Sequence, residues 1–249
     1  MSGASWPLVR IAAASDVHGH EFLDPYLRGL KALPAVEALL LAGDLTDRND
    51  LDDFGRVIDA TLQQISCPVI AVFGNNEWAT HHADYRQRAG VTFLEDEAHL
   101  LESGGERLRI VGSTGTLDQP TGWQRRNLPS IEREYRDREA RIEALLSDPA
   151  PTVLLTHYPP THATMGAEKP EWRSQLGSLR LEAAVRRRRP LAVIHGHVHK
   201  GVARGEIGDG QATLEGPQPA IPVFNVALPV TRGVTLLEWR GGMFSSEIK

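Results

Sequence analysis

Polar residues that can bind a metal ion follow five short apolar runs in this sequence. The five groups are Asp16-Val17-His18, Gly43-Asp44, Gly74-Asn75-Asn76-Glu77, Thr156-His157 and His195-Gly196-His197-Val198-His199. The runs before them are rich in Val, Ile and Leu, which is typical of buried strands. Because ligands gather at the carboxyl ends of strands in α/β sheets, we expect the five groups to meet at one site.

The side chains in these groups combine carboxylate or amide oxygens with imidazole nitrogens. The candidate metal ligands are Asp16, His18, Asp44, Asn75, His157, His197 and His199. This mixture favours divalent Mn, Fe, Zn or Co over Ca, and it contains no thiolate. So many donors exceed the needs of one tetrahedral zinc ion, but they suit two ions that share a carboxylate. Two such ions clamp the attacking and leaving oxygens of a phosphoryl displacement.

The motifs D-x-H, GD, GN-x-E, H and GHxH, in this order, resemble those of the calcineurin-like metallophosphoesterases. They extend from Asp16 to His199, whereas the insertions and the C-terminal tail match only in general style. The resemblance implies a sandwich of two sheets and a pair of metal ions. It implies that Asp16, His18 and His199 hold the first ion, that Asn75, His157 and His197 hold the second, and that Asp44 bridges them.

One residue departs from the family pattern. The usual motif is GNH[DE], and Asn76 occupies the position of the histidine that contacts the substrate phosphate. An Asn side chain donates a hydrogen bond but cannot protonate a leaving alkoxide. The loss of general acid catalysis costs roughly 10²–10⁴-fold with poor leaving groups and little with good ones. We therefore favour a phosphodiesterase, with Asn76 as a substrate-binding and catalytic residue beside Asp44.

Other histidines are candidates to supply the missing proton, namely His20, His81, His82 and His162. His20 lies two residues after His18 and is either a surface loop residue or a contact to the phosphate, so we include it among the catalytic and substrate-binding candidates. His81 and His82 are expected to begin a surface helix, and only one of them can face the site. His195 is expected to be a hydrogen-bonded group outside the ligand set.

The composition limits the classes of protein. The chain has 249 residues, of which 27 are Lys or Arg and 32 are Asp or Glu, for a formal charge of −5. This balance makes a nucleic-acid polymer an improbable partner. Cys67 is the single cysteine, which excludes an internal disulfide. The sequence has neither a long apolar stretch nor the pattern of a signal peptide, so we expect a cytoplasmic protein without a membrane partner. The oligomeric state stays open.

Apolar runs and helical spacing alternate in the first half, which indicates βαβ units. Strands are predicted over 9–14, 38–41, 69–73, 153–155, 191–194, 201–207, 223–227, 234–239 and 243–248, with a hairpin over 98–112. Helices are predicted over 24–33, with Asp24 as the N-cap, and over 51–65, 131–146 and 179–189. We predict an α/β fold in which two mixed β-sheets pack as a sandwich flanked by helices.

We expect a single metallophosphoesterase domain over residues 1–249, in which segments 116–130 and 159–178 are insertions or lids. Trp123 and Trp172 lie in these segments and Tyr158 directly precedes the second one. These three side chains either rim a pocket or fix the segments to the body, and we favour the second role. Trp6 and Trp239 are expected at the sandwich edge, and Cys67 is expected to be structural. The run from Arg186 to Arg189 is expected to complement a helix C-terminus rather than to bind nucleic acid.

The sequence thus predicts a dinuclear metal-dependent phosphoesterase that hydrolyses a small phosphoester, by in-line attack of a metal-bound hydroxide. A phosphodiesterase is favoured, with Mn as the first candidate for both ions and Fe or Zn next. The alternatives within enzymes are a phosphomonoesterase or a Ser/Thr protein phosphatase. The alternative from another class is a non-catalytic interaction module that retains the fold, although such modules typically lose ligands and every ligand position is filled here.

Overall fold

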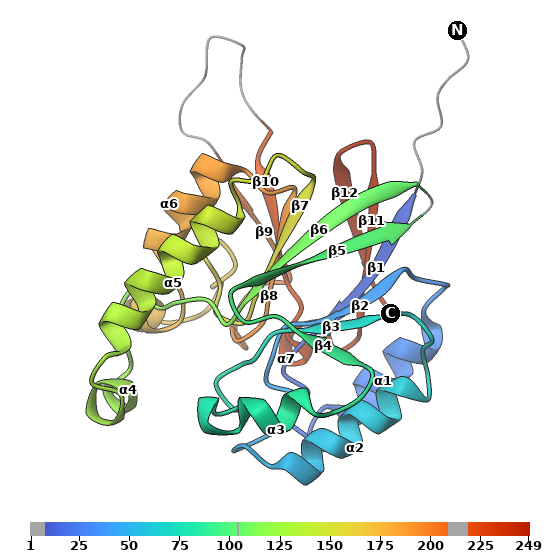
Figure 1. Cartoon of the computed structure of the whole chain (residues 1–249), viewed down its shortest axis with the longest axis horizontal. Coiled ribbons are helices and arrows are strands. Elements are labelled where there is room, and N and C mark those ends of the chain that lie inside the picture. The colour runs from blue at the N-terminus through green and yellow to red at the C-terminus, as the bar shows by residue number, and fades with distance from the viewer. Residues whose placement is uncertain (1–7, 104, 209–218) are drawn as a thin grey trace, which may run out of the picture.

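The computed structural model describes residues 8–103, 105–208 and 219–249, and it contains two six-stranded sheets that face each other (Figure 1). The first sheet contains, in spatial order, β12 (Met243–Ile248), β11 (Thr235–Arg240), β1 (Val9–Ala14), β2 (Ala38–Leu41), β3 (Val69–Ala71) and β4 (Val91–Phe93). The second contains β5 (Glu97–Ser103), β6 (Glu106–Ser113), β7 (Thr152–Thr156), β8 (Ala192–His195), β10 (Ile221–Asn225) and β9 (Arg204–Ile207).

Both sheets mix parallel and antiparallel strands. In the first sheet, β1, β2, β3 and β4 are parallel to one another, and β11 pairs antiparallel with both β1 and β12. In the second, β6, β7, β8 and β10 are parallel, and β5 and β9 pair antiparallel with the edges of this set. The predicted α/β sandwich of two mixed sheets is therefore confirmed. The parallel strands of each sheet point their carboxyl ends in one direction, where a ligand site is expected.

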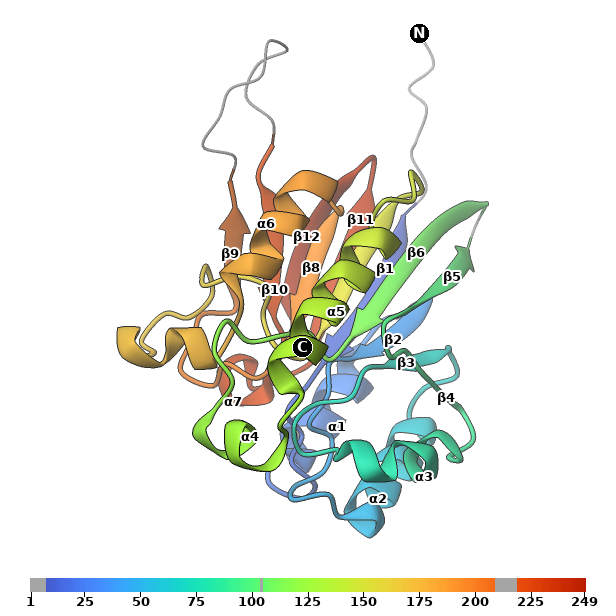
Figure 2. The ribbon, with the colours of Figure 1, turned by 60° about the vertical axis from the view of Figure 1, so that its left-hand side comes forward.

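Helices cover the outer face of each sheet (Figures 1 and 2). The first sheet carries α1 (Leu23–Ala32), α2 (Leu51–Leu62) and α3 (His82–Arg86), and the second carries α5 (Ile131–Leu145) and α6 (Leu179–Arg188). Shorter helices are α4 (Gly122–Asn127), α7 (Leu228–Thr231) and the 3₁₀ turns η1 (Ala79–His81) and η2 (Pro170–Gln175). No helix in the described ranges is long and apolar enough to cross a membrane.

Side chains alternate along each strand, and the alternation divides the apolar core into layers. Leu40 of β2 packs with Leu155 and Ile194 of the second sheet, in the layer between the sheets. Its neighbours Leu39 and Leu41 pack on the opposite face, with the apolar side chains of α1 and α2. Both faces of β2 are therefore buried, which explains why this strand is an uninterrupted apolar run.

The sequence places the elements well and their ends less well. The strands over 9–14, 38–41 and 243–248 have the predicted bounds, and the other predicted strands form with shifted ends. The prediction that Asp24 caps a helix is wrong, because α1 begins one residue earlier and Phe22 occupies the N-cap without a side-chain hydrogen bond. The helix predicted to reach residue 65 ends at Leu62, and the chain then turns into the Cys67-Pro68 entry to β3.

The segments 116–130 and 159–178 are joined to each other by hydrogen bonds. Asp118 N donates to Gly177 O at 3.0 Å, and Gln119 N donates to Ser174 O at 2.7 Å. The Asp118 carboxylate also accepts the backbone N–H of Leu179, at the start of α6, at 2.9 Å. The helices α4 and η2 within these segments were not predicted.

Candidate metal centre

The two sheets meet at the carboxyl ends of their parallel strands. A parallel bridge joins Ser15, just after β1, to Ala227, just after β10. Ser15 N donates to Val226 O at 3.1 Å, and Asp16 N donates to Gly43 O at 3.0 Å. These backbone bonds bring the ends of β1, β2 and β10 together, so that the chain segments with the predicted ligands converge.

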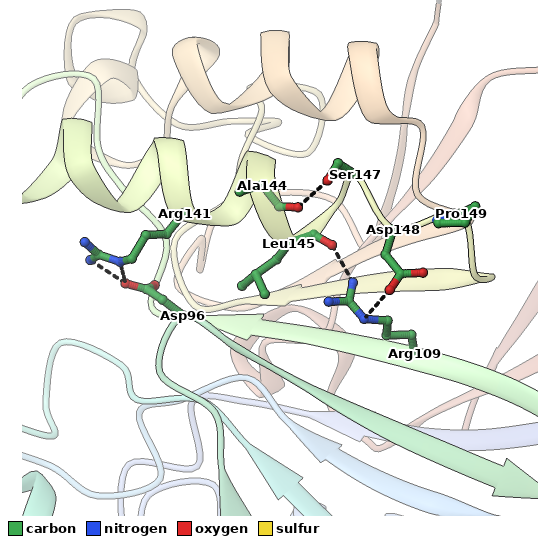
Figure 3. Close-up of a pocket in the computed structure, with 8 residues that line it drawn as sticks. All are labelled: Asp96, Arg109, Arg141, Ala144, Leu145, Ser147, Asp148 and Pro149. Atoms are coloured by element: carbon green, nitrogen blue, oxygen red, sulfur yellow. Dashed lines mark hydrogen bonds and ion pairs between the residues drawn. The ribbon is translucent and has the colours of Figure 1, made fainter.

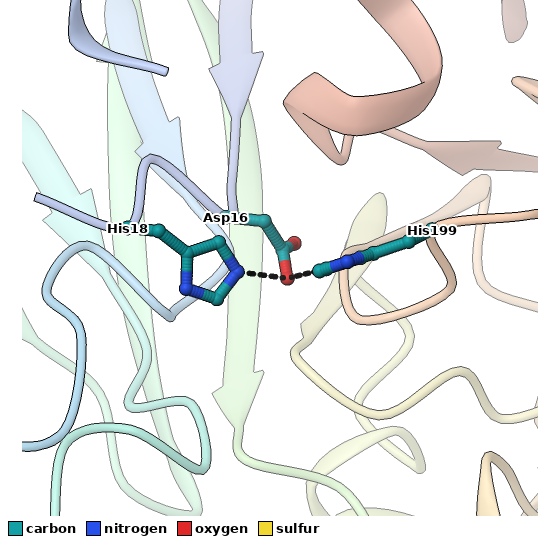
Figure 4. Close-up of side chains that lie close together, drawn as sticks. All are labelled: Asp16, His18 and His199. Atoms are coloured by element: carbon teal, nitrogen blue, oxygen red, sulfur yellow. Dashed lines mark hydrogen bonds and ion pairs between the residues drawn. The ribbon is translucent and has the colours of Figure 1, made fainter. Parts of the chain in front are cut away.

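The first cluster of donors comprises Asp16, His18 and His199 (Figure 4). Nε2 of His199 lies 2.8 Å from Asp16 Oδ1, and Nε2 of His18 lies 3.6 Å from the same oxygen. Figure 4 shows the two imidazoles on opposite sides of the carboxylate. Asp16 is fully buried, and His18 Nε2 is a buried atom without a hydrogen-bond partner. This nitrogen is therefore free to bind a cation.

The second cluster comprises Asp16, Asp44 and His157, so Asp16 belongs to both clusters. His157 Nδ1 donates to Ala42 O at 2.9 Å, which leaves Nε2 as the nitrogen with a free electron pair. That Nε2 lies 3.6 Å from Asp44 Oδ1 and 3.0 Å from Asn75 Oδ1. The structure thus places a carboxylate, an amide and an imidazole around one point.

His197 completes the predicted set. Its ring centroid lies 5.0 Å from that of His157 and 4.7 Å from that of Tyr158, and its backbone N–H donates to Asp16 Oδ2 at 2.9 Å. The structure therefore brings the side chains of the seven candidate ligands close together. Tyr158 is buried against these rings and fixes the start of segment 159–178 to the body.

The charges in the site perturb one another. Burial alone would raise the pKa of Asp16, but the adjacent imidazoles of His18 and His199 outweigh it and hold the pKa well below its usual range. Burial lowers the pKa of His18, yet the neighbouring Asp16 carboxylate and the Asp44 charge raise it to about 9. Burial holds the pKa of the His197 imidazole well below its usual range. The carboxylates therefore attract positive charge to this point.

The backbone at the site adopts unusual conformations. Asp16, His18, Asp44 and His197 have φ of 57°, 48°, 52° and 70°, in the left-handed region that costs a non-glycine residue about 1 kcal/mol. Neighbouring glycines permit close approach, since a Cβ on Gly74 would lie 2.2 Å from Asp44 Oδ1. A Cβ on Gly196 would lie 2.5 Å from Asp16 Oδ2. The backbone at these positions is strained, and this conformation directs the donor atoms into the site.

Glu77 is a functional residue that sequence reasoning left without a role. Its buried carboxylate accepts four backbone N–H groups, from Asp44 at 2.9 Å, Leu45 at 2.7 Å, Thr46 at 3.2 Å and Gly74 at 2.7 Å. It thereby ties the turn after β2 to the turn after β3. Burial and the Asp44 charge raise the pKa of Glu77, while the N–H donors stabilise its ionised form. The signal in the sequence was the final residue of GN-x-E.

Ser15 is a second residue that the sequence analysis missed. Its Oγ donates to Asp16 Oδ2 at 2.6 Å, and this bond leaves Asp16 Oδ1 to the two imidazoles. A serine between an apolar strand and a ligand carries no distinctive signal, because most such residues are ordinary turn residues.

Asn76 lies beside the Asp44 carboxylate, as its place in the motif requires. Its backbone N–H donates to Asp44 Oδ1 at 2.8 Å, and its Nδ2 donates to Asp44 Oδ2 at 2.7 Å. Its Oδ1 accepts the backbone N–H of Arg48 at 3.2 Å. The amide therefore offers hydrogen-bond donors at the metal site and has no proton to give to a leaving group.

The other candidate histidines differ in their surroundings. His20 is exposed on the loop after His18. His81 ends η1, where Nδ1 lies 2.8 Å from Asn49 Nδ2, and His82 begins α3. His162 lies 3.8 Å from Asp118 Oδ2 and is half-buried.

His195 is fully buried, and its ring nitrogens lie 2.8 Å from Thr164 Oγ1 and 2.8 Å from Gly196 O. These contacts are those of a hydrogen-bonded group outside the ligand set.

The exposure of two tryptophans contradicts the prediction that these side chains fix the insertions to the body. Trp123 in α4 is 55% exposed and Trp172 in η2 is 50% exposed, with Lys169 Nζ 4.8 Å from the Trp172 ring.

Trp239 is buried in the layer between the sheets, and Cys67 is partly buried beneath α1 and α2. Trp6 lies outside the described residues.

A hollow between α5 and β6 shares no residue with the donor clusters (Figure 3). Within it, Arg141 is 2.6 Å from Asp96 and Arg109 is 3.8 Å from Asp148. Both guanidinium groups are therefore paired with protein groups. The basic run at the end of α6 is paired in the same way, since Arg186 contacts Glu182 at 2.6 Å and Arg187 contacts Glu143 at 2.8 Å.

Comparison with known proteins agrees with this geometry. The model of the calcineurin-like phosphoesterase family matches residues 9–201, so the chain belongs to this family, as the motifs predicted. Family membership indicates a phosphoesterase with a metal requirement. No curated protein matches the sequence.

Solved structures share the fold at low sequence identity. The protein TT1561 of Thermus thermophilus superimposes with a TM-score of 0.60 at 16% identity, over 97% of this chain and 99% of that one. A hypothetical protein from the same organism gives 0.54 at 15% identity, over 97% and 99%. The purple acid phosphatase PPD1 from yellow lupin (Lupinus luteus) seeds gives 0.55 at 13% identity, over 98% of this chain and 52% of that one.

The residues present fit the metal that the family requires. Two buried carboxylates lie next to imidazole nitrogens, and one of these, His18 Nε2, lacks a hydrogen-bond partner although it is buried. A buried ionised group is costly unless it is paired, and a divalent ion would neutralise both carboxylates. The orientation of His157 by Ala42 O is the arrangement that metal-binding imidazoles commonly have.

Replacement of Glu77 by Gln should destabilise the protein. The new amide nitrogen would face backbone N–H donors in place of an acceptor, and loss of a hydrogen bond to a charged group costs about 1.5–3 kcal/mol. We expect the free energy of unfolding in urea to fall by at least this amount. Glu171→Gln, which alters an exposed carboxylate in η2, is the control and should leave it unchanged. Equal stability of the two variants would contradict the role given to Glu77.

Proposed function

We propose that this protein is a dinuclear metal-dependent phosphodiesterase. The observation that carries the proposal is the pair of adjoining donor clusters, Asp16–His18–His199 and Asp16–Asp44–His157, which have Asp16 in common. A single ion needs fewer donors than this set offers. Asp44 lies 3.6 Å from His157 and its charge also acts on His18 of the other cluster, and we assign Asp44 as the carboxylate that bridges the two ions.

When bound, a pair of divalent ions supplies positive charge for the phosphoryl oxygens and lowers the pKa of water toward about 7. Mn²⁺ is our first candidate, followed by Fe or Zn, because the donors are hard oxygens and imidazoles. Asp16, His18 and His199 would hold one ion, and Asn75, His157 and His197 the other. Ser15 and the Ala42 carbonyl keep Asp16 and His157 in orientation through the hydrogen bonds described above.

The side chains around the donors bind and orient the phosphoester. Asn76 presents its amide beside Asp44 and is assigned a hydrogen bond to a phosphoryl oxygen. His20 lies exposed on the same loop as His18 and is assigned to contact the substrate. The Asn76 amide donates a hydrogen bond but cannot transfer a proton to the leaving group. The favoured substrates therefore have leaving groups that depart without protonation. A small phosphodiester in the cytoplasm is the substrate we propose.

A phosphomonoesterase or Ser/Thr protein phosphatase is the second candidate. The purple acid phosphatase from lupin has the same fold, which supports this alternative only at the level of architecture. The residue that distinguishes the two is Asn76, because monoesters with alkoxide leaving groups gain most from a general acid. The filled ligand positions speak against a non-catalytic module.

Asp44→Asn should lower the rate of phosphoester hydrolysis by about 100-fold or more, because a shared ligand that loses its charge weakens both ion sites. The rate of hydrolysis of bis-p-nitrophenyl phosphate with Mn²⁺ measures this effect. Asp47→Asn, on the same loop with a half-exposed side chain, is the matched control. Circular dichroism verifies that both variants are folded. Retention of near wild-type activity by Asp44→Asn would overturn the scheme.

The preference for diesters is tested by a direct comparison of two chromogenic substrates. With Mn²⁺ present, kcat/KM for bis-p-nitrophenyl phosphate should exceed kcat/KM for p-nitrophenyl phosphate, since the protein lacks the histidine at position 76. A higher value for the monoester would reverse the assignment in favour of a phosphomonoesterase. A panel of cyclic nucleotides, dinucleotides and phospholipid head groups then narrows the substrate class.

Asn76→His should raise the hydrolysis rate of esters with poor leaving groups by about 10-fold or more, and change the rate of p-nitrophenyl esters little. The physical reason is that an imidazolium at this position protonates the departing alkoxide. Asn127→His, which places the same residue on an exposed position of α4, is the control. A variant with no gain on the alkyl esters would show that position 76 is not adjacent to the leaving group.

A further inference from the structure

His82 lies between two hydrogen-bond acceptors that belong to different segments. Its Nδ1 is 3.0 Å from Glu95 Oε1, in the connection between β4 and β5, and its Nε2 is 3.1 Å from Glu77 O. The His82 side chain is only 14% exposed. His82 is separated from the metal donors by Glu77, and the assignment of ligands above gives it no role.

Both partners of the ring are hydrogen-bond acceptors. A backbone carbonyl is an acceptor only, and an ionised carboxylate is likewise an acceptor only. The hydrogen bond from His82, together with Arg86, lowers the pKa of Glu95 to about 2, so Glu95 is ionised at neutral pH. Each ring nitrogen of His82 therefore faces an acceptor, and the ring connects the β4–β5 connection to the turn after β3.

Stacking holds the His82 ring in place. His82 stacks on Phe73 with ring centroids 3.6 Å apart and an interplanar angle of 11°, and Phe93 stacks on Phe73 at 4.3 Å. These contacts fix the plane of the His82 ring, so that its two nitrogens stay directed at Glu95 and at the Glu77 carbonyl. The other charged groups near the pair are Arg86, which lies 3.2 Å from Glu95, and Glu97, which lies 4.0 Å from Arg86.

The contact to Glu77 connects this pair to the metal donors. The carboxylate of Glu77 holds the backbone N–H groups of Asp44 and Gly74, and the carbonyl of the same residue is held by His82. A continuous chain of hydrogen bonds therefore runs from Glu95 through His82 and Glu77 to the backbone of Asp44. Its members come from the β4–β5 connection, α3, the turn after β3 and the turn after β2.

We propose that His82, hydrogen-bonded between Glu95 and the Glu77 carbonyl, is a positioning residue that fixes Asp44 for metal binding. The proposal rests on the metal centre of the proposed function. His82 does not touch the ions or the substrate. It orders the turn that carries Asn75, Asn76 and Glu77, so its removal would weaken ion binding while the two sheets and their apolar core stay intact.

The test is the affinity of the metal-stripped full-length protein for Mn²⁺ alone, measured by isothermal titration calorimetry. His82→Ala should raise the dissociation constant about 10-fold, which is the lower end of the effect of removing an outer-shell partner. His82→Gln keeps one donor for the Glu77 carbonyl and should recover part of the affinity. Glu95→Gln alters the far end of the chain of hydrogen bonds and should weaken Mn²⁺ binding in the same direction.

His99→Ala is the matched control, because His99 is a half-buried histidine on β5 and belongs to neither donor cluster. The visible absorption spectrum of the Co²⁺-loaded protein adds a second readout, since its bands report the geometry of the ligands. We expect the bands of His82→Ala to shift and those of His99→Ala to match the wild type. Thermal unfolding of the metal-stripped variants separates these effects from general destabilisation.

The outcomes are distinct. If His82→Ala and His82→Gln unfold at lower temperature but bind Mn²⁺ with wild-type affinity and unchanged Co²⁺ bands, His82 has a structural role only and the proposal is overturned. If His82→Ala does not fold, the Gln variant and Glu95→Gln decide the question by the same measurement. A wild-type protein that binds no Mn²⁺ would overturn the metal centre itself, which is a different failure from variants that bind as well as the wild type.

Discussion

Two buried carboxylates that must be neutralised are the constraint around which this structure is built. Asp16 is inaccessible to solvent and Asp44 is 2% exposed, and both lie where the two sheets converge. Isolated negative charges are unstable in such surroundings. Imidazoles from three segments and backbone N–H groups surround these carboxylates, and a divalent ion would complete the charge balance. The segments after β1, β2, β3, β7 and β8 therefore each supply a carboxylate or a group that lies against one.

Convergence of the strand ends depends on backbone contacts more than on side chains. The bridge between Ser15 and Ala227 joins the sheets, and hydrogen bonds link Asp16 to Gly43 and Gly196 to His157. The glycines at this seam are small enough to let one turn lie against another, as the short approach of Gly74 to Asp44 shows. Glu77 then fixes two turns through a single carboxylate. The donor atoms are thus oriented by backbone hydrogen bonds between turns and by the Glu77 carboxylate.

Much of this arrangement could be predicted from local sequence. Apolar runs followed by Asp, Asn or His indicated the strands, their direction and the donor set, because a parallel strand has a fixed polarity. Contacts between distant segments carry no local signal. The four N–H bonds of Glu77 and the stacking of His82 on Phe73 depend on how turns far apart in the chain pack. The exposure of Trp123 and Trp172 was missed for the same reason, since a tryptophan in a polar segment is compatible with either outcome.

The left-handed backbone at Asp16, His18, Asp44 and His197 has a consequence for the stability of the protein. A glycine at any of these positions would relax the chain, by about 1 kcal/mol for each residue. This backbone cost is appreciable in a molecule whose net stability is typically only about 5–15 kcal/mol. The hydrogen bonds of the Asp16 and Asp44 carboxylates offset part of it, so the donor side chains themselves help to hold the strained turns in place.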